Sequence, residues 1–296
     1  MTQSQQSAKP SVCVIGIGIM GDAVVRRFLE CGFAPKVRGR RPETEEPLIA
    51  LGAERVMSPA EAAATCDYVI LLLPTPQAVQ DVTFGENGLA SAGRRDTLII
   101  DMSTTDPEMS RQFEARLGEE TGMRWIDAPL SGGAPGALAG ELTLMVGGSD
   151  ENFEEARTVL SAVCSNYTHM GPVGAGQSSK MINQIMVGCT FAVLAEAVSL
   201  AKRSGIDAAK LPAVFKGGRA DSRILQEFMP MMVSGDWELT GKISSLVKDF
   251  GLVEHVAAAV GAPLPMTSVA ASLHRILNNQ GHGEEPNVAV MKLYEE

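Results

Sequence analysis

The chain has 296 residues, which is enough for two domains with substantial hydrophobic cores. Hydrophobic residues make up 45% of it and charged residues 20%, which is ordinary for a globular protein. The net charge of −10 at pH 7 argues against a broad surface for nucleic acid or for anionic membranes. We therefore expect no nucleic-acid partner, while local basic pockets stay open.

The cysteines and histidines do not form a pattern typical of a disulfide framework or a metal site. The five cysteines include no CxxC pair, so we expect reduced thiols in a cytoplasmic protein. The four histidines show no HxxxH spacing and no nearby carboxylate cluster, so no metal is predicted. The most apolar segment, residues 186–201, is short and carries Glu196, so no membrane span is predicted.

Residues 11–171 show short β-branched runs that alternate with amphipathic helical stretches, after a polar stretch at 1–10 that predicts a disordered tail. The run at 67–73 is continuously apolar, as strands buried on both faces are. We therefore expect a mostly parallel sheet with helices on both faces. The predicted strands are 11–15, 35–38, 67–73, 97–101, 125–128, 142–146 and, more weakly, 167–170.

Capping residues mark several helix ends in this half of the chain. Ser58 and Glu61 form a capping box, and Asp106 and Ser149 are placed to cap two further helices. Gly122 stands where a left-handed cap ends a helix.

The strand patterns stop after residue 171, and helical patterns follow. The predicted helices are 178–204, 208–216, 224–234, 243–260 and 266–278. We predict an α/β domain over 11–171 and an all-α C-terminal domain over 172–296, linked by the long helix that starts near Ser178. The cleft between the two domains is then the expected active site.

A GxGxxG motif follows the first predicted strand directly and opens a helix; its residues are Gly16, Ile17, Gly18, Ile19, Met20 and Gly21. Such glycines permit a tight turn, a close backbone approach to a pyrophosphate and close helix–sheet packing. Alone, the motif is also explained by a structural glycine turn. In this strand–helix context it predicts a Rossmann-type dinucleotide-binding domain.

The end of the second predicted strand indicates which dinucleotide is bound. NAD-binding sites have an acidic residue there for the ribose 2′-hydroxyl. This chain instead has Gly39, Arg40 and Arg41, with no carboxylate to repel a 2′-phosphate and two guanidinium groups that can bind one. The alternative is a solvated basic turn. We predict NADP(H) as the preferred cofactor and leave NAD(H) open.

Residues after two later strands extend the predicted cofactor site. Leu73 and Pro74 end a strand where a cofactor lies across the carboxyl edge of the sheet. Ser103 and Thr104 follow the next strand, where two roles that do not exclude each other are open to their hydroxyls: contact with the nicotinamide ribose and capping of the helix that begins near Pro107.

A loop rich in small residues, 127–140, follows the strand at 125–128. Within it Ser131, Gly132 and Gly133 offer a hydroxyl and successive N–H groups, which suit a substrate carboxylate. A glycine-rich crossover loop explains the pattern nearly as well.

Lys180 stands near the start of the long apolar helix, with Asn183 three residues on and so on the same face. Hydride attack on a carbonyl builds negative charge on its oxygen, which a lysine ammonium can stabilise and protonate. In the alternative, Lys180 extends to solvent from the helix start. The pair Lys248 and Asp249 is a weaker candidate, because most such pairs are surface features.

Together these motifs resemble those of the β-hydroxyacid dehydrogenase family, which includes 3-hydroxyisobutyrate dehydrogenase. The markers occur in family order and spacing over nearly the whole chain: GIGIMG, LP, STTDP, DAPLSGGAPGALAGELTLMVGG, GAGQSSKMINQ and KDF. Within the family, the resemblance is nearest to tartronate semialdehyde reductases, which are also called 2-hydroxy-3-oxopropionate reductases.

The resemblance implies that Lys180 is catalytic, that Asn183 orients the substrate and that residues 131–133 bind the substrate carboxylate. It also implies cofactor contacts from the GxGxxG motif, Leu73, Pro74, Thr104 and Lys248, the last of which also faces the substrate. The implied reaction is NAD(P)H-dependent interconversion of a small carboxylate-bearing aldehyde and its β-hydroxyacid. Family members are usually homodimers or homotetramers that pack through their helical domains.

Departures from the family pattern leave the substrate open. Arg219 and Arg223 stand where smaller or apolar residues are expected, and they are candidates for a second contact to an acidic substrate, although a solvated position is favoured for Arg223. The alternatives are a 3-hydroxyisobutyrate dehydrogenase or a glyoxylate/succinic semialdehyde reductase. An imine reductase, which usually lacks the lysine, and a catalytically silent nucleotide-binding module are alternatives of other classes.

Overall fold

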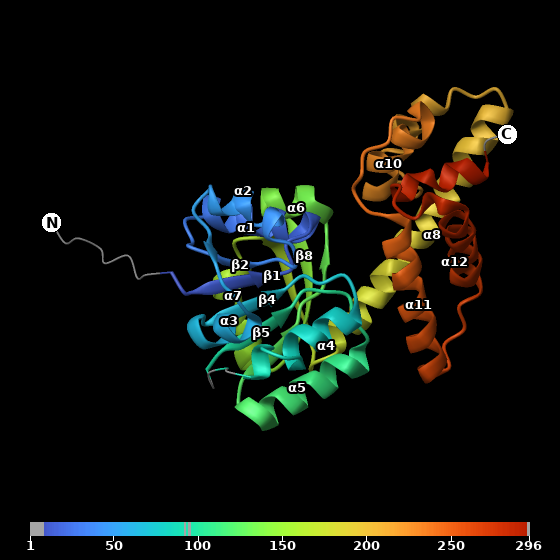
Figure 1. The fold of residues 1–296 in the computed structure, drawn as a ribbon. Helices are drawn as coiled ribbons and strands as arrows, with labels where there is room; N and C mark the ends of the chain where they lie inside the picture. Colours follow the sequence, from blue (N-terminus) through green and yellow to red (C-terminus); the bar gives the residue numbers. More distant parts are fainter. Residues whose placement is uncertain (1–8, 92, 94–95, 295–296) are drawn as a thin grey trace. The chain divides into compact units, whose positions relative to one another are not determined.

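A computed structural model describes residues 9–91, 93 and 96–294 (Figure 1). The chain divides into two compact units, Met1–Lys180 and Met181–Glu296. The division falls inside helix α8 (Ala175–Arg203), whereas the predicted boundary after residue 171 lies just before this helix and stays a prediction. Most of the predicted tail at 1–10 lies outside the described residues.

The first unit is built on a mostly parallel sheet, which confirms the predicted Rossmann-type fold. Its strands are β1 (Val12–Ile15), β2 (Lys36–Arg38), β3 (Glu54–Arg55), β4 (Tyr68–Leu71), β5 (Leu98–Asp101), β6 (Arg124–Asp127), β7 (Leu130–Ser131), β8 (Leu142–Gly147) and β9 (Cys164–Gly171). The order is β3-β2-β1-β4-β5-β6-β8-β7, and β9 pairs with β8. All pairs from β3 to β6 are parallel, while β8 runs antiparallel to β6 and β7.

The strand order reverses beside β1, which positions the site. The chain runs from β1 outward through β2 to β3 and then returns to place β4 on the other side of β1. In doubly wound sheets, ligands bind outside the carboxyl ends of the strands at this switch point. The segments that follow β1 and β4 are therefore the first place to look for a cofactor site.

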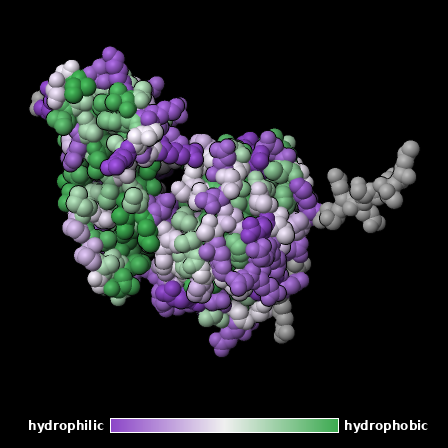
Figure 2. All heavy atoms as spheres, turned by 180° about the vertical axis from the view of Figure 1, so that it is seen from behind, coloured by the Kyte–Doolittle hydropathy of each residue, from purple (hydrophilic) through white to green (hydrophobic). Residues whose placement is uncertain are grey.

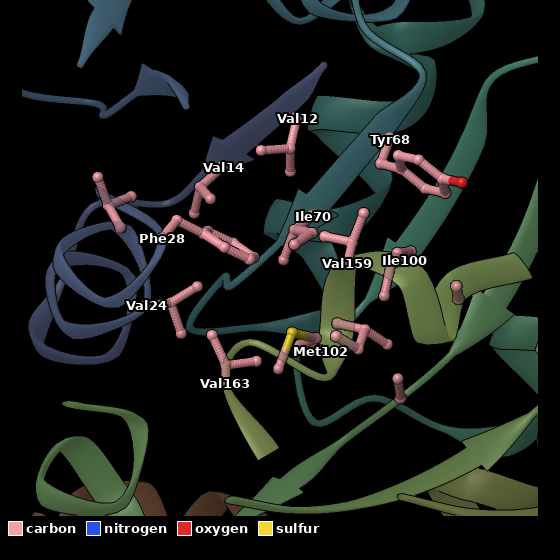
Figure 3. Close-up of a cluster of buried hydrophobic side chains, with 14 of the residues drawn as sticks. Val12, Val14, Val24, Phe28, Tyr68, Ile70, Ile100, Met102, Val159 and Val163 are labelled. Atoms are coloured by element: carbon pink, nitrogen blue, oxygen red, sulfur yellow. The ribbon is translucent and has the colours of Figure 1, made fainter. Parts of the chain in front are cut away.

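Helices cover both faces of this sheet because successive strand residues point to opposite sides. On one face, Val12 and Val14 of β1 pack with α1 (Ile19–Glu30) and α7 (Asp150–Leu160); Figure 3 shows Val24, Phe28 and Val159 beside them. On the other, Cys13 and Ile15 belong to a core with α3 (Pro59–Thr65), α4 (Pro76–Phe84) and α5 (Pro107–Thr121). The short helices of this unit are α2 (Glu46–Ile49), α6 (Gly133–Ala139) and 3₁₀ turns at Pro42–Thr44 and Leu89–Ser91.

The predicted caps are present. The Ser58 hydroxyl accepts a hydrogen bond from the Glu61 N–H, Asp106 caps α5 and Ser149 caps α7, while Gly122 ends α5 in a left-handed conformation. Two strands were not predicted. The two-residue β3 carries charged side chains at the sheet edge, and β7 lies inside the small-residue loop, so neither shows a hydrophobic pattern.

The second unit is helical in its described part, as predicted. With the greater part of α8 it contains α9 (Leu211–Phe215), α10 (Arg223–Ser234), α11 (Ile243–Val260) and α12 (Pro265–Leu277), with 3₁₀ or π turns at Ala208–Lys210, Asn278–His282 and Asn287–Leu293. The predicted helix at 208–216 divides into a 3₁₀ turn and α9, which begins at Leu211 with Pro212 in its first turn. One hydrophobic core joins α8, α10, α11, α12 and the C-terminal 3₁₀ turn.

Helix α8 corrects one expectation. It has 29 residues and a mean hydropathy of 1.7 in its most apolar window, so it is long and apolar enough to cross a membrane, and its apolar segment is not short. However, 44% of that window is buried within the protein, and Phe191, Leu194 and Val198 lie in the core of the second unit. One side of α8 therefore contributes to the core of the second unit. All five cysteines are free thiols, as predicted.

Candidate active site

The GxGxxG loop has the geometry of a pyrophosphate-binding turn. Gly16 has φ +107°, and a Cβ built there would lie 2.3 Å from the Leu72 carbonyl oxygen. A Cβ on Gly21 would lie 2.0 Å from the carbonyl oxygen of Gly16, so the helix packs directly on the turn. A Cβ on Gly18, in contrast, meets no atom within 4 Å. These are the three separate roles of the glycines in a dinucleotide-binding motif, and the residues fit the cofactor.

The start of α1 is accessible beside this loop. Gly18 occupies the N-cap position without a side chain to satisfy the first N–H groups, and the side chain of Ile19 is 55% exposed. Backbone N–H groups at a helix N-terminus have no partner inside the helix and attract phosphate. Ile17 is buried in the core and so anchors the turn from below.

The end of β2 carries Arg40 and Arg41, both exposed. Neither forms an ion pair with a carboxylate of the described residues. One carboxylate that stands several residues beyond this strand end in the sequence lies beside it in the structure. Glu45 is fully buried there, and its Oε1 accepts a hydrogen bond of 2.6 Å from the Gly39 N–H. Its charge is compensated by Arg55 and, at 3.8 Å, by Arg38, so it faces the protein rather than a ligand.

The segments after β4 and β5 are tied to each other. The Ser103 hydroxyl accepts a hydrogen bond of 2.9 Å from the Leu73 N–H, next to the exposed Pro74. Thr104 is half-buried. Because Asp106 caps α5, helix capping is not the role of Ser103 or Thr104.

Lys180 lies at the small-residue loop. Its Nζ donates a hydrogen bond of 2.8 Å to the Leu130 carbonyl oxygen, and the residue is only 8% exposed. The alternative in which Lys180 extends to solvent is therefore wrong. Leu130 directly precedes Ser131, Gly132 and Gly133, where the two glycines have φ +124° and +63°. The first unit thus brings the predicted lysine and the predicted carboxylate-binding loop together.

Two buried carboxylates at neighbouring strand ends were not predicted as site residues. Asp101 and Asp127 end β5 and β6 at paired positions. Burial raises the pKa of Asp101 to about 7 against hydrogen bonds from Ser103, and burial raises the pKa of Asp127 to about 6 against backbone hydrogen bonds from Gly174 and Gln177. The available sequence signal was an aspartate at the end of each of two apolar strands.

In the second unit, Asn183 and Lys248 belong to one polar chain. The Asn183 Nδ2 donates to the Gln184 Oε1 at 2.8 Å, and the Gln184 Nε2 donates to the Asp249 Oδ2 at 2.5 Å. The Lys248 Nζ lies 3.1 Å from the Asp249 Oδ1. Gln184 and Asp249 are both buried. The sequence offered Asp249 only as part of a weak candidate pair with Lys248, and it gave Gln184 no role. Arg219 and Arg223 take no part in this chain of polar contacts. Both are exposed, and Arg223 pairs with Glu227.

Metal chemistry finds no support in the parts of the chain that the structure describes, where no group of three or more His, Cys, Asp or Glu residues could hold an ion.

Comparison with known proteins identifies the family. A family model of the NAD-binding domain of 6-phosphogluconate dehydrogenase matches residues 11–171, and one of the NAD-binding domain of NADP-dependent 3-hydroxyisobutyrate dehydrogenase matches 174–294. The chain is 34% identical to an L-threonate dehydrogenase of Cupriavidus necator, over 96% of each chain. It is 32% identical to the 2-hydroxy-3-oxopropionate reductase of Escherichia coli, over 95% of this chain and 96% of that protein.

A solved 3-hydroxyisobutyrate dehydrogenase from Salmonella typhimurium has the same fold. It superposes with a TM-score of 0.86 at 32% identity, covering 96% of this chain and 99% of the other. The pyrophosphate-type turn, the two matching family models and these full-length similarities agree, and the chain belongs to the β-hydroxyacid dehydrogenase family of NAD(P)-dependent oxidoreductases.

Proposed function

We propose that this chain interconverts a small carboxylate-bearing aldehyde and its β-hydroxyacid, of the tartronate semialdehyde and glycerate type, with NADP(H) as the preferred cofactor and Lys180 as the proton donor. The observation that carries the proposal is the Lys180 ammonium, buried at the small-residue loop with its Nζ 2.8 Å from the Leu130 carbonyl oxygen. A lysine that only improved solubility would not be withdrawn from water in this way.

The chemistry assigned to Lys180 follows from its charge and position. When bound, the reduced cofactor supplies the hydride that adds to the carbonyl carbon of the substrate. The Lys180 ammonium stabilises the negative charge that then develops on the carbonyl oxygen and delivers a proton to it. In the oxidative direction a neutral Nζ accepts the hydroxyl proton. Asn183, three residues on in α8, is proposed to orient the substrate.

The loop next to Lys180 is proposed to bind the substrate carboxylate. The Ser131 hydroxyl and the backbone N–H groups of Gly132 and Gly133 are donors, and the glycines leave room for close approach. This arrangement fixes the aldehyde relative to Lys180. The Lys180 ammonium donates its hydrogen bond to the carbonyl oxygen of Leu130, and Leu130 directly precedes Ser131 in the chain.

Three observations support the preference for NADP(H). Arg40 and Arg41 are exposed at the end of β2, where a 2′-phosphate needs charge-assisted hydrogen bonds. The buried Glu45 is compensated by Arg55 and Arg38 and so does not repel that phosphate. The C-terminal family model describes an NADP-dependent enzyme. Leu73, Pro74, Thr104 and Lys248 are proposed as further cofactor contacts.

The test is steady-state oxidation of NADPH and NADH with tartronate semialdehyde, succinic semialdehyde, glyoxylate and a cyclic imine. We expect the highest kcat/KM with tartronate semialdehyde, and we expect Lys180→Ala to lower kcat by about 10²- to 10⁴-fold, the range for loss of a general acid. Lys202→Ala is the matched control, because Lys202 is an exposed lysine in the last turn of the same helix. Wild-type kcat in Lys180→Ala contradicts the proposed mechanism.

The same assay separates the alternatives. A better rate with succinic semialdehyde or glyoxylate assigns the chain to those reductases. The reverse assay, reduction of NADP⁺ or NAD⁺ with 3-hydroxyisobutyrate, assigns it to that dehydrogenase if turnover is seen. Turnover of the imine alone points to an imine reductase. Cofactor binding without turnover of any substrate points to a silent nucleotide-binding module.

We further propose that the second unit mediates homo-oligomer formation. Large hydrophobic side chains are exposed on α8 (Ile182, Met186, Val193 and Leu200) and on α12 (Met266, Val269 and Ile276). The two helices lie side by side where Cys189 contacts Thr267. Figure 2 shows hydrophobic residues gathered along this unit. A contiguous apolar surface of this kind is typical of an interface between protein subunits.

A further inference from the structure

A buried carboxylate ties the start of helix α8 to the sheet. Asp127, the last residue of β6, accepts two backbone hydrogen bonds of 2.7 Å, from the Gly174 N–H to its Oδ1 and from the Gln177 N–H to its Oδ2. These donors lie at the N-terminal end of α8, where N–H groups have no partner inside the helix. Asp127 therefore caps a helix that begins 48 residues later in the chain.

The carboxylate has little freedom in this position. A Cβ on Gly147 would lie 2.4 Å from the Asp127 Oδ1, and a Cβ on Gly176 would lie 2.8 Å from its Oδ2. The two glycines let the helix start approach the sheet closely enough for both hydrogen bonds. The carboxylate and the first turn of α8 therefore hold each other in one place.

The side chain of Gln177 adds a second tie to the same turn. It is fully buried, its Oε1 accepts a hydrogen bond of 3.1 Å from the Thr105 N–H, and its Nε2 donates one of 2.9 Å to the Ser103 carbonyl oxygen. The segment after β5 and the end of β6 thus both bind the first turn of α8.

Lys180 lies one helical turn beyond this anchor. It follows Gln177 by three residues, and its Nζ reaches the carbonyl oxygen of Leu130, which follows Asp127 by three residues. The segment 127–130 therefore binds the start of the helix at one end and the Lys180 ammonium at the other. A shift of the first turn moves the base of the Lys180 side chain relative to residues 130–133.

We propose that Asp127, supported by Gln177, is a positioning residue: it holds the first turn of α8 so that the Lys180 Nζ stays at the loop 130–133. This inference rests on the proposed function, in which Lys180 donates the proton. Because a displacement of about 1 Å can lower a rate about 100-fold, loss of the anchor should reduce kcat by that order. It should leave cofactor affinity unchanged, since the GxGxxG turn lies after β1, on separate residues.

Asp127→Asn and Asp101→Asn form a matched pair, since both remove a buried carboxylate at the end of neighbouring strands. The partners of Asp127 are both N–H donors, so an asparagine NH₂ group would face one of them and lose that bond. The partners of Asp101 are the Ser103 N–H and the Thr105 hydroxyl, and the hydroxyl can turn to accept from the NH₂ group. We therefore expect the effect on α8 from Asp127→Asn alone.

The test measures three quantities on the full-length protein: amide hydrogen exchange of the peptide covering 174–183 without cofactor, the NADPH dissociation constant, and kcat. For Asp127→Asn we expect exchange in that peptide at least about 10-fold faster, kcat about 100-fold lower and a dissociation constant within about threefold of wild type. Asp101→Asn should stay close to wild type in all three. Exchange that accelerates while kcat stays within threefold of wild type overturns the positioning role, as does unchanged exchange.

A second variant covers the case in which Asp127→Asn does not fold. Gln177→Met keeps the backbone bonds to Asp127 and the volume of the side chain but removes both ties to residues 103 and 105. It should lower kcat, measured at saturating NADPH, by about 10-fold. If Asp127→Asn does not fold and Gln177→Met has wild-type kcat, the inference is wrong. Failure of the proposed function is recognised separately, by wild-type kcat in Lys180→Ala whatever the exchange data show.

Discussion

Gly18 and Gly21 allow two alanine substitutions with opposite expected outcomes. Gly18 has φ −103°, which any residue can adopt, and an added Cβ meets no atom within 4 Å. We therefore expect Gly18→Ala to cost less than about 1 kcal/mol of stability, the cost of a poorer N-cap residue. The methyl group would nevertheless stand where the backbone approaches the pyrophosphate, so NADPH affinity should fall at least about 10-fold, or about 1.4 kcal/mol.

Gly21→Ala should instead cost much more stability than Gly18→Ala. Its Cβ would lie 2.0 Å from the Gly16 carbonyl oxygen, so either the turn or the start of α1 must move. Overpacking of this kind costs about 3 kcal/mol. At about 2–4 °C per kcal/mol for a domain of this size, the thermal midpoint should fall by about 6–12 °C, against less than about 4 °C for Gly18→Ala.

The assays are thermal unfolding of the cofactor-free variants and fluorescence titration with NADPH. The reasoning is refuted if Gly18→Ala binds NADPH as tightly as wild type. It is also refuted if Gly18→Ala lowers the thermal midpoint as much as Gly21→Ala, since the space above Gly18 would then not be open.

Three further predictions concern the cofactor, pH and assembly. Arg40→Ala combined with Arg41→Ala should raise KM for NADPH at least about 10-fold more than KM for NADH, because only NADPH carries the 2′-phosphate; equal effects contradict the assignment. The folded-state pKa of Asp101, about 7, lies above its unfolded value near 3.9, so its contribution to stability is full below pH 4 and is lost as pH rises through 7. Between pH 5 and pH 8 the free energy of unfolding, measured by urea unfolding, should thus fall more in wild type than in Asp101→Asn, by up to about 3 kcal/mol. Parallel pH profiles of the two proteins contradict this prediction. Met186→Glu with Leu200→Glu should shift the protein to a smaller species in light scattering, as both side chains are largely exposed on α8; an unchanged mass places the interface elsewhere.

Much of the fold could be predicted because local patterns determine it. Apolar runs such as 67–73 locate strands, and capping residues such as Ser58 and Asp106 locate helix starts. Both signals come from chemistry that acts over a few residues. The short strands β3 and β7 were missed because a strand of two residues has no periodicity and forms only where a neighbouring strand is present. The capacity of α8 to span a membrane by length was misjudged because only the segment 186–201 was considered, whereas the whole helix of 29 residues contains a longer apolar window.

The candidate site, like the fold, could be predicted only in part. Motif spacing alone pointed to the GxGxxG turn, to Lys180 and to residues 131–133. The position of Glu45 beside Gly39 was not visible, since it depends on a chain reversal after β2 and on the guanidinium of Arg55 from β3. The burial of Lys180 was not visible either. It depends on a hydrogen bond to the carbonyl oxygen of Leu130, which lies 50 residues earlier in the chain.

The sequence by itself determined the fold class, the dinucleotide-binding turn and the residue types available for carbonyl chemistry, because each depends on neighbours within one or two helical turns. Only the tertiary structure decided how Lys180 is held. Asp127, Ser103 and Leu130 hold the start of α8 through hydrogen bonds to Gly174, Gln177 and Lys180, which are far from them in the chain. Such bonds leave no periodic signal, since a buried donor needs only one acceptor at the right distance and any part of the chain can supply it.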